Sequence, residues 1–144
     1  MLLNDAPEVE GLRRIAETHR RHGTTGLFPT LISDHPAVTR RAIDAARAAR
    51  HAGVPGVLGL HLEGPFLNPE RSGIHPPDRL RRGDETDRRW LQQQAADLPL
   101  IMTLAPECVP GGIHSRAHPR GHPGQRRPHG GESRTRSAGP WRKG

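Results

Sequence analysis

Two ionisable side chains stand two residues apart near the start of the segment GLHLEGPFLNPERSGIHPPDRL, residues 59–80. If this segment begins as a regular strand, His61 and Glu63 point to the same side, because side chains alternate along a strand. A carboxylate at the end of a strand can bind a divalent cation or act as a general base. The alternative is a solvated strand end in which Glu63 only caps the next turn, since most acidic residues lie at the surface. The spacing alone leaves both interpretations open.

Two other ionisable residues occupy comparable places. His75 follows Gly73 and Ile74 in the proline-rich loop after this strand, and by itself it is typical of a surface histidine. Glu107 ends the next predicted strand, a position analogous to that of Glu63, and by itself it is typical of a solvated strand end. Neither residue alone indicates a functional site.

The elements that would position these residues alternate along the chain. Apolar residues at helical spacing predict helices over residues 4–23, 33–56 and 84–99. Short apolar and β-branched runs predict strands over 24–33, 56–64 and 99–107. Helices and strands that alternate in this way predict a parallel α/β sheet. The order does not choose between an open sheet and a barrel.

Local signals refine these elements. Asp5 is the predicted cap of the first helix, and Ser33 or Asp34 that of the second. The predicted buried face of the third helix consists of Trp90, Leu91 and Ala95. The second strand is apolar on both faces, which indicates a parallel sheet covered on both sides.

The positive charge of the chain is confined to its last part. The net charge is +7, and residues 108–144 hold seven arginines and one lysine against a single acid, Glu132. Residues 1–107 are therefore neutral overall, and the charge does not support a nucleic-acid-binding role for the whole chain. One cysteine, Cys108, excludes an internal disulfide and suits a reducing compartment. No apolar run approaches the ~18 residues of a membrane span, so we expect a cytoplasmic protein without membrane contact.

Residues 111–144 differ in composition from the rest and are rich in Arg, Gly, Pro and His. They show no periodic apolar face, so we expect a disordered tail. Four histidines in this part follow one another at spacings of four, four and seven: His114, His118, His122 and His129. The prolines between them exclude the helix that would bring them together as metal ligands.

Three stretches of the chain resemble N-acetylglucosamine-6-phosphate deacetylase, a family of the amidohydrolase superfamily. They are LLNDAPEVEGLRRIAETHRRHGTTGLFPTLISDHP, GVLGLHLEGPFLNPERSGIHPPDRL and TLAPE, in this order and at natural spacing. The resemblance runs from about residue 2 to residue 110. It implies a partial (β/α)₈ barrel of about three parallel strands over residues 1–110, because 144 residues are too few for the ~250 of a whole barrel.

The resemblance also implies a chemistry, namely metal-dependent hydrolysis of N-acetylglucosamine 6-phosphate to glucosamine 6-phosphate and acetate in amino-sugar catabolism. Glu63 matches the carboxylate that binds a divalent metal (zinc, iron or manganese), and Ile74 with His75 matches the loop pair that contacts the sugar phosphate. His61 and Glu107 are expected to lie around the metal ligand without contacting the metal. Members of the family often form homo-oligomers, and nothing in the resemblance points to nucleic acid.

Other residues of the family pattern have no counterpart here. Two metal-binding histidines and the catalytic aspartate are not matched, so we expect no catalytic residue and no activity from this chain alone. One hypothesis is that residues from about 113 onward are a frameshifted translation, and the other reading frames of the DNA would test it. Two alternatives remain: a small α/β module that binds a sugar phosphate, and an interaction protein acting through its basic tail.

Overall fold

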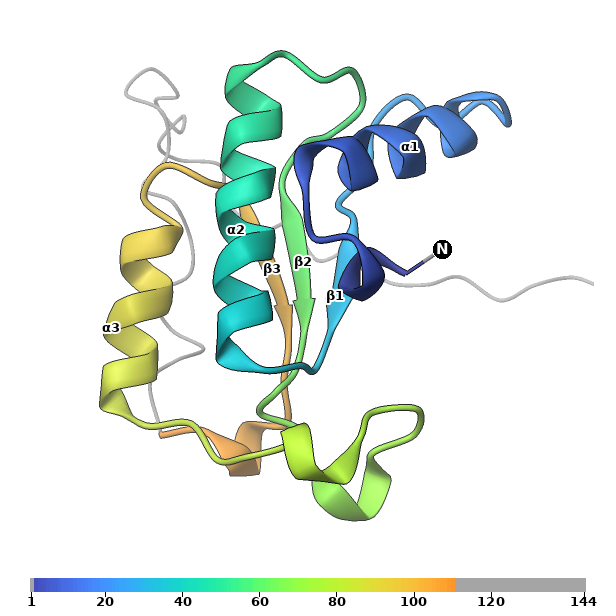
Figure 1. Cartoon of the computed structure of the whole chain (residues 1–144). Coiled ribbons are helices and arrows are strands. Elements are labelled where there is room, and N and C mark those ends of the chain that lie inside the picture. The colour runs from blue at the N-terminus through green and yellow to red at the C-terminus, as the bar shows by residue number, and fades with distance from the viewer. Residues whose placement is uncertain (1, 111–144) are drawn as a thin grey trace, which may run out of the picture.

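The computed structural model describes residues 2–110 as alternating helices and strands (Figure 1). The helices are α1 (Val9–Arg20), α2 (Pro36–His51) and α3 (Glu85–Gln94), and the strands are β1 (Thr30–Ile32), β2 (Leu60–Glu63) and β3 (Leu100–Thr103). Short 3₁₀ helices occupy Leu3–Asp5, Pro69–Arg71, Pro77–Arg79 and Pro106–Cys108. The predicted tail and its four histidines lie outside the described residues.

The three strands form one parallel sheet in the order β1-β2-β3. Thr30 pairs with His61 across β1 and β2, and Glu63 pairs with Thr103 across β2 and β3. The predicted parallel α/β arrangement is therefore confirmed for the described residues. Because the strands are parallel, all three carboxyl ends meet at one edge, where Glu63 lies.

One face of the sheet carries the core. Leu31, Leu60 and Leu62 are buried and belong to the same apolar cluster as residues of α1 and α2, with parts of α3 packed against it. Ile101 on the opposite face is 48% exposed, and Thr103 is also exposed. The prediction of a sheet covered on both faces was therefore wrong for residues 2–110, where the helices cover only one.

Helix α1 begins later than its sequence signals indicated. Its first residue is Val9, and Glu8 precedes it without a side-chain cap, so the predicted cap by Asp5 was wrong. Asp5 instead ends a short 3₁₀ helix, because the chain turns before Pro7. The predicted apolar face is confirmed, since Leu12 and Ala16 are fully buried.

Helix α2 starts at Pro36, preceded by His35 with no side-chain cap. The predicted cap by Ser33 or Asp34 was wrong, because both side chains bind elsewhere. Asp34 accepts a hydrogen bond from Asn4 Nδ2 at 2.9 Å, and the contacts of Ser33 are described below. Helix α2 buries a face made mostly of alanines, which belongs to the same apolar cluster as the strand residues.

Helix α3 begins with a capping box in which Asp84 accepts from the Asp87 N–H at 2.9 Å and Asp87 accepts from the Asp84 N–H at 3.0 Å. These bonds satisfy N–H groups that a helix start leaves free. Trp90 and Leu91 pack against the core as predicted. Ala95 is exposed, so its predicted burial was wrong, since the helix ends at Gln94.

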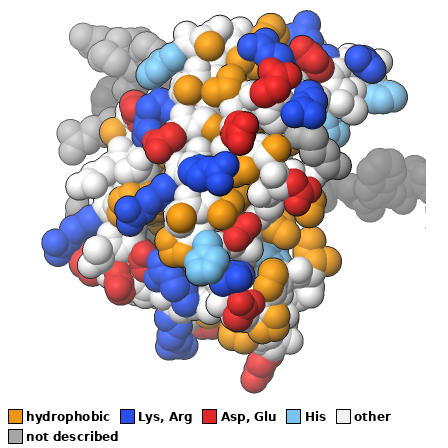
Figure 2. All heavy atoms as spheres, viewed as in Figure 1, with side chains coloured by type: hydrophobic (Ala, Val, Ile, Leu, Met, Phe, Trp, Pro, Cys, Tyr) orange, Lys and Arg blue, Asp and Glu red, His pale blue; other side chains and the backbone are white. Residues whose placement is uncertain are grey.

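The face of the molecule that carries the helices is charged but balanced. Figure 2 shows acidic and basic side chains interspersed over it, without a large patch of one sign. This agrees with the neutral balance of residues 1–107. Among the described residues, no helix combines the length and the apolar character needed to cross a membrane.

Candidate functional site

Glu63 is the last residue of β2, and the chain turns sharply after it. Gly64 has a φ of +83°, a left-handed conformation that favours glycine, and the Gly64–Pro65 peptide bond is cis. The Glu63 side chain is 36% exposed. Its carboxylate is thus partly open to solvent at the carboxyl edge of the sheet, where parallel α/β proteins place their sites.

His75 comes from the loop after β2 and returns to the same edge. Its Nε2 lies 3.7 Å from Glu63 Oε1, and its side chain is 6% exposed. Its other ring nitrogen, Nδ1, lies 2.9 Å from Ser33 Oγ and accepts from the Ser33 backbone N–H at 3.3 Å. The structure therefore brings together two of the residues that the sequence singled out, and adds Ser33.

The loop is held in place by Phe66, which is 2% exposed. The Arg81 guanidinium lies over its ring at 5.0 Å from the centroid, and the Arg81 N–H donates to the Pro65 carbonyl at 3.1 Å. The Ala105 N–H donates to the Phe66 carbonyl at 2.8 Å. These contacts fix both ends of the loop, while Ile74 near its middle is 76% exposed.

His61 lies on the same face of β2 as Glu63 and connects the three strands. Its Nδ1 is 3.0 Å from Thr30 Oγ1 on β1, and its Nε2 is 2.9 Å from Thr103 Oγ1 on β3. A neutral imidazole donates through one nitrogen and accepts through the other, and each hydroxyl can supply the complementary role. The ring is thereby fixed across the open face of the sheet, next to the strand end that carries Glu63.

Glu107 lies in the 3₁₀ helix after β3 and has other partners. Asn68 Nδ2 donates to its Oε1 at 3.1 Å, and Arg82 Nη2 donates to its carbonyl at 3.2 Å. Its own backbone N–H and then the Asn68 bond hold the pKa of the Glu107 carboxyl below its usual value. Glu107 thus ties the loop to the segment after β3.

Sequence reasoning missed three residues that contact the two histidines: Ser33, Thr30 and Thr103. Ser33 and Thr30 lie in the predicted first strand, yet only the pairing of the strands brings them to His75 and His61. The signal available in the sequence was a Ser or Thr within, or directly after, a strand that neighbours the strand of Glu63. It has little specificity without the register.

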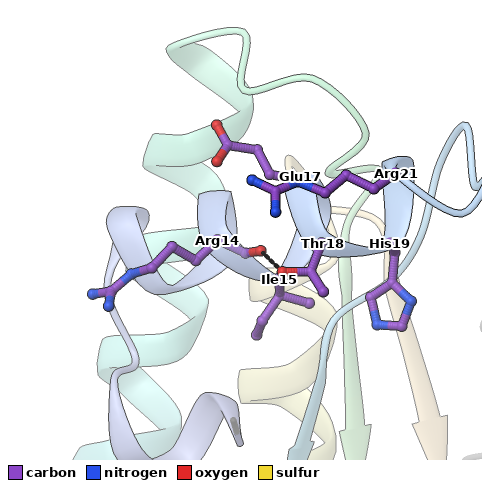
Figure 3. A pocket seen from close by; sticks show the side chains of 6 residues that line it. All are labelled: Arg14, Ile15, Glu17, Thr18, His19 and Arg21. Carbon is purple, nitrogen blue, oxygen red and sulfur yellow. Dashed lines mark hydrogen bonds between the residues drawn. The ribbon is translucent and has the colours of Figure 1, made fainter.

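A separate hollow lies on α1, away from the strand ends (Figure 3). Its lining comes from this helix and the turn after it: Arg14, Ile15, Glu17, Thr18, His19 and Arg21. The Thr18 hydroxyl donates to the Arg14 carbonyl at 2.8 Å, so it is already used within the helix. We assign no chemistry to this hollow.

Comparisons with known proteins agree with the resemblance seen in the sequence. No family model matches the chain. The chain is 42% identical over 110 residues to the N-acetylgalactosamine-6-phosphate deacetylase of Shewanella sp. (strain ANA-3), a match that covers 76% of this chain and 27% of the relative. It is 40% identical over 91 residues to the N-acetylglucosamine-6-phosphate deacetylase of Bacillus subtilis (strain 168), which covers 59% of this chain and 23% of that enzyme.

The fold supports the same relationship. The crystal structure of N-acetylglucosamine-6-phosphate deacetylase from Pasteurella multocida matches with a TM-score of 0.69 and 29% identity, over 75% of this chain and 28% of that one. The chain spans about a quarter of the length of the relatives that it matches. In sequence and in fold, the chain is therefore similar to one part of the amino-sugar-6-phosphate deacetylases, along about three quarters of its own length.

Proposed function

We propose that residues 2–110 form part of the (β/α)₈ barrel of an amidohydrolase that removes the acetyl group from a 6-phosphorylated N-acetylhexosamine. N-acetylglucosamine 6-phosphate is the expected substrate, and the galactosamine epimer is the alternative because the relatives carry both names. In this proposal Glu63 contributes a carboxylate to the metal site, and Ile74 with His75 contacts the sugar phosphate.

The observation that best supports the proposal is the short distance between the side chains of Glu63 and His75. The carboxylate and the imidazole lie 3.7 Å apart at the carboxyl edge of a parallel sheet, although twelve positions separate them in the sequence. Active sites of barrel enzymes are built at this edge, from the loops that follow the strands. Burial of His75 in that position has a structural cost that a surface loop would avoid, so its burial supports a functional role.

The uncovered face of the sheet supports the proposal that the three strands are part of a barrel. Parallel sheets are almost always covered on both faces, whereas here Thr30, Ile101 and Thr103 are exposed within the described part of the chain. In a closed barrel this face would be the interior, filled by side chains of the other strands. The three strands would then account for part of such a barrel.

The described residues do not fit a complete metal site. No group of three or more His, Cys, Asp or Glu side chains within residues 2–110 is arranged to hold an ion. Glu63 is the one metal ligand that the proposal assigns within residues 2–110, while catalytic zinc sites use three protein ligands. We therefore derive no step through a metal, and the proposal requires further donors from outside residues 2–110.

The same proposal places the end of the barrel part of the chain near residue 110. Cys108 is 6% exposed and its carbonyl accepts from the Gly83 N–H at 2.8 Å, so the packed part of the chain reaches at least this far. The disordered tail over 111–144, assembly into homo-oligomers and a cytoplasmic location stay predictions. We also propose supporting roles for His61 and Glu107 around Glu63, His61 through its contacts across the sheet and Glu107 through its contacts with the loop.

A chimera tests the proposal. Residues 2–110 replace the matching region of the Bacillus subtilis enzyme, and release of acetate from N-acetylglucosamine 6-phosphate is measured. The proposal predicts turnover, because the grafted strands and loop supply the same groups. A folded chimera without turnover, compared with an active parent enzyme, would count against it.

A further inference from the structure

Arg81 lies at the end of the loop after β2 and contacts the start of the same loop. Its backbone N–H donates to the Pro65 carbonyl at 3.1 Å, and its guanidinium lies 5.0 Å from the centroid of the Phe66 ring. A guanidinium is planar and stacks on an aromatic face, which a lysine ammonium does not reproduce. One residue therefore holds the end of the loop beside its beginning.

The same guanidinium joins the loop to helix α3. Arg81 Nη1 and Nη2 donate to the two carboxylate oxygens of Asp87, each at 2.6 Å. Asp87 is itself held in place, because it forms the capping box with Asp84 and its side chain is only 16% exposed. Two parallel bonds between an arginine and a carboxylate fix an orientation as well as pairing two charges. The loop end is thus tied to a helix that packs on the core.

The segment between His75 and Arg81 is short and stiff. Pro76 and Pro77 follow the histidine directly, and a proline ring fixes the φ angle of its own residue. A 3₁₀ helix comes next, in which the Arg79 N–H donates to the Pro76 carbonyl at 2.9 Å. Few backbone torsions remain in this segment, so a movement of the loop end is transmitted to the histidine.

The segment on the other side of His75 is longer and can deform more easily. It contains Gly73, which has a φ of +57°, and nothing lies within 4 Å of a Cβ atom added there. Glycine accepts a wide range of backbone torsions. The position of the imidazole therefore depends chiefly on the stiff segment that ends at Arg81.

We propose that Arg81 is a positioning residue that keeps the His75 imidazole beside Glu63 by fixing the end of the loop. The bonds of its side chain go to Asp87 and to the Arg82 carbonyl, so it acts on the pair through the loop. Its part in substrate binding rests on the proposed function, in which His75 contacts the sugar phosphate. The position of the imidazole is a property of the folded chain.

The test measures how fast diethyl pyrocarbonate modifies His75 in the full 144-residue chain at about pH 8, above the ordinary pKa of an imidazole. Mass spectrometry of peptides separates the histidines, and exposed His51 at the end of α2 is the internal reference. His75 is 6% exposed and should react far more slowly than His51. Arg81→Ala should raise the rate ratio of His75 to His51 about fivefold to tenfold, because charge-assisted hydrogen bonds that keep the loop closed are lost.

Two further variants separate this effect from the loss of any ion pair. Arg81→Lys keeps a charge beside Asp87 but loses the stack and the paired bonds, and should give an intermediate rate ratio. Arg88→Ala is the matched control, since Arg88 pairs with Glu85 in the same helix and its hydrogen bonds stay within α3. It should leave the rate ratio within about twofold. Circular dichroism checks that each variant is folded.

A second readout uses the chimera that carries residues 2–110. Arg81→Ala should raise KM for N-acetylglucosamine 6-phosphate about tenfold and leave kcat within about threefold, because Arg81 acts on the substrate-binding loop while Glu63 stays on its strand. A variant that only reduced the amount of folded enzyme would lower the apparent kcat and leave KM unchanged. The split between KM and kcat therefore distinguishes positioning from general stability.

A wild-type His75 that reacts as fast as His51 would overturn the proposal. So would a folded Arg81→Ala with the wild-type rate ratio, an equal rise in Arg88→Ala, or a lower kcat at unchanged KM. Should Arg81→Ala fail to fold, the wild-type and Arg81→Lys rates still decide. An inactive parent chimera with the expected His75 rates would contradict the proposed function and leave this inference standing.

Discussion

The hydroxyl of Ser33 occupies the space in which a side chain at Gly64 would begin. Gly64 also has a φ of +83°, so both conformation and space require glycine at the end of β2. The residue before it is Glu63, and Ser33 in turn contacts His75. The glycine in the sequence HLEGPF therefore leaves the space that Ser33 occupies beside His75.

Replacement of Gly64 by alanine should destabilise the chain strongly. The left-handed conformation costs a non-glycine residue roughly 1–2 kcal/mol, and overlap with Ser33 adds about 1–3 kcal/mol. The free energy of unfolding from urea titration measures the sum. Gly23→Ala is the matched control, because Gly23 also has a positive φ, +91°, but nothing lies within 4 Å of an added Cβ atom. Equal losses in the two variants would show that the contact with Ser33 has no energetic weight.

The stability of the loop after β2 should depend on Phe66 and not on Ile74. Phe66→Ala should cost about 3–5 kcal/mol, because a buried ring is removed, and should speed proteolysis within the loop. Ile74→Ala should change stability by less than about 0.5 kcal/mol, since Ile74 is 76% exposed. Urea titration and timed proteolysis of both variants test this difference. Similar proteolysis of the two would contradict the anchoring role of Phe66.

Stability should fall in acid because of ion pairs at the start of α3. The hydrogen bond from Arg88 lowers the pKa of Glu85 to about 2, and the hydrogen bonds from Arg81 lower the pKa of Asp87. A carboxyl with a lowered pKa in the folded state stabilises the fold above its unfolded pKa, and this contribution disappears as the pH falls through the folded value. The loss should therefore occur between about pH 4.5 and pH 2.

Asp87→Asn should flatten this acid dependence. Urea midpoints at about pH 5, 4 and 3 would measure it, because each midpoint follows the free energy of unfolding. Glu17→Gln is the control, since Glu17 forms no ion pair within residues 2–110 of the structure. If the urea midpoints of both variants changed with pH as those of the wild type do, the Arg81–Asp87 pair would have no role in the acid transition.

The order of helices and strands could be predicted because its signals are local. Apolar residues at helical spacing in α1 and α2 and short β-branched runs in the strands define the elements without tertiary information. Errors occurred at element ends. Asp5 and Asp34 are good caps by type, yet the helices start later, at Val9 and Pro36.

The site could be predicted only in part. The long signature HLEGPFLNPERSGIH singled out Glu63 and His75, but the contact between them depends on how the loop folds. Ser33 was one of two predicted caps of the second helix, with Asp34 the other, because both residue types are common helix caps. Its true partner His75 lies 42 positions away, a distance that no local pattern covers.

The full chain by itself should not release acetate. Within residues 2–110, Glu63 is the proposed metal ligand, and no group of three His, Cys, Asp or Glu side chains could hold an ion. We expect no turnover of N-acetylglucosamine 6-phosphate by the purified 144-residue chain with added zinc, manganese or iron. The Bacillus subtilis enzyme in the same assay serves as the positive control. Metal-dependent acetate release that Glu63→Gln abolishes would contradict this expectation.

The most direct test of the central claim is the effect of Glu63→Gln in the chimera that carries residues 2–110. Loss of the carboxylate should lower kcat/KM for N-acetylglucosamine 6-phosphate by at least about 100-fold, the order of effect of removing one charged group from a reacting site. Glu70→Gln, in the same loop but exposed, should leave kcat/KM within about twofold. Full activity of the folded Glu63→Gln chimera would contradict the assignment of this strand end to the deacetylase site.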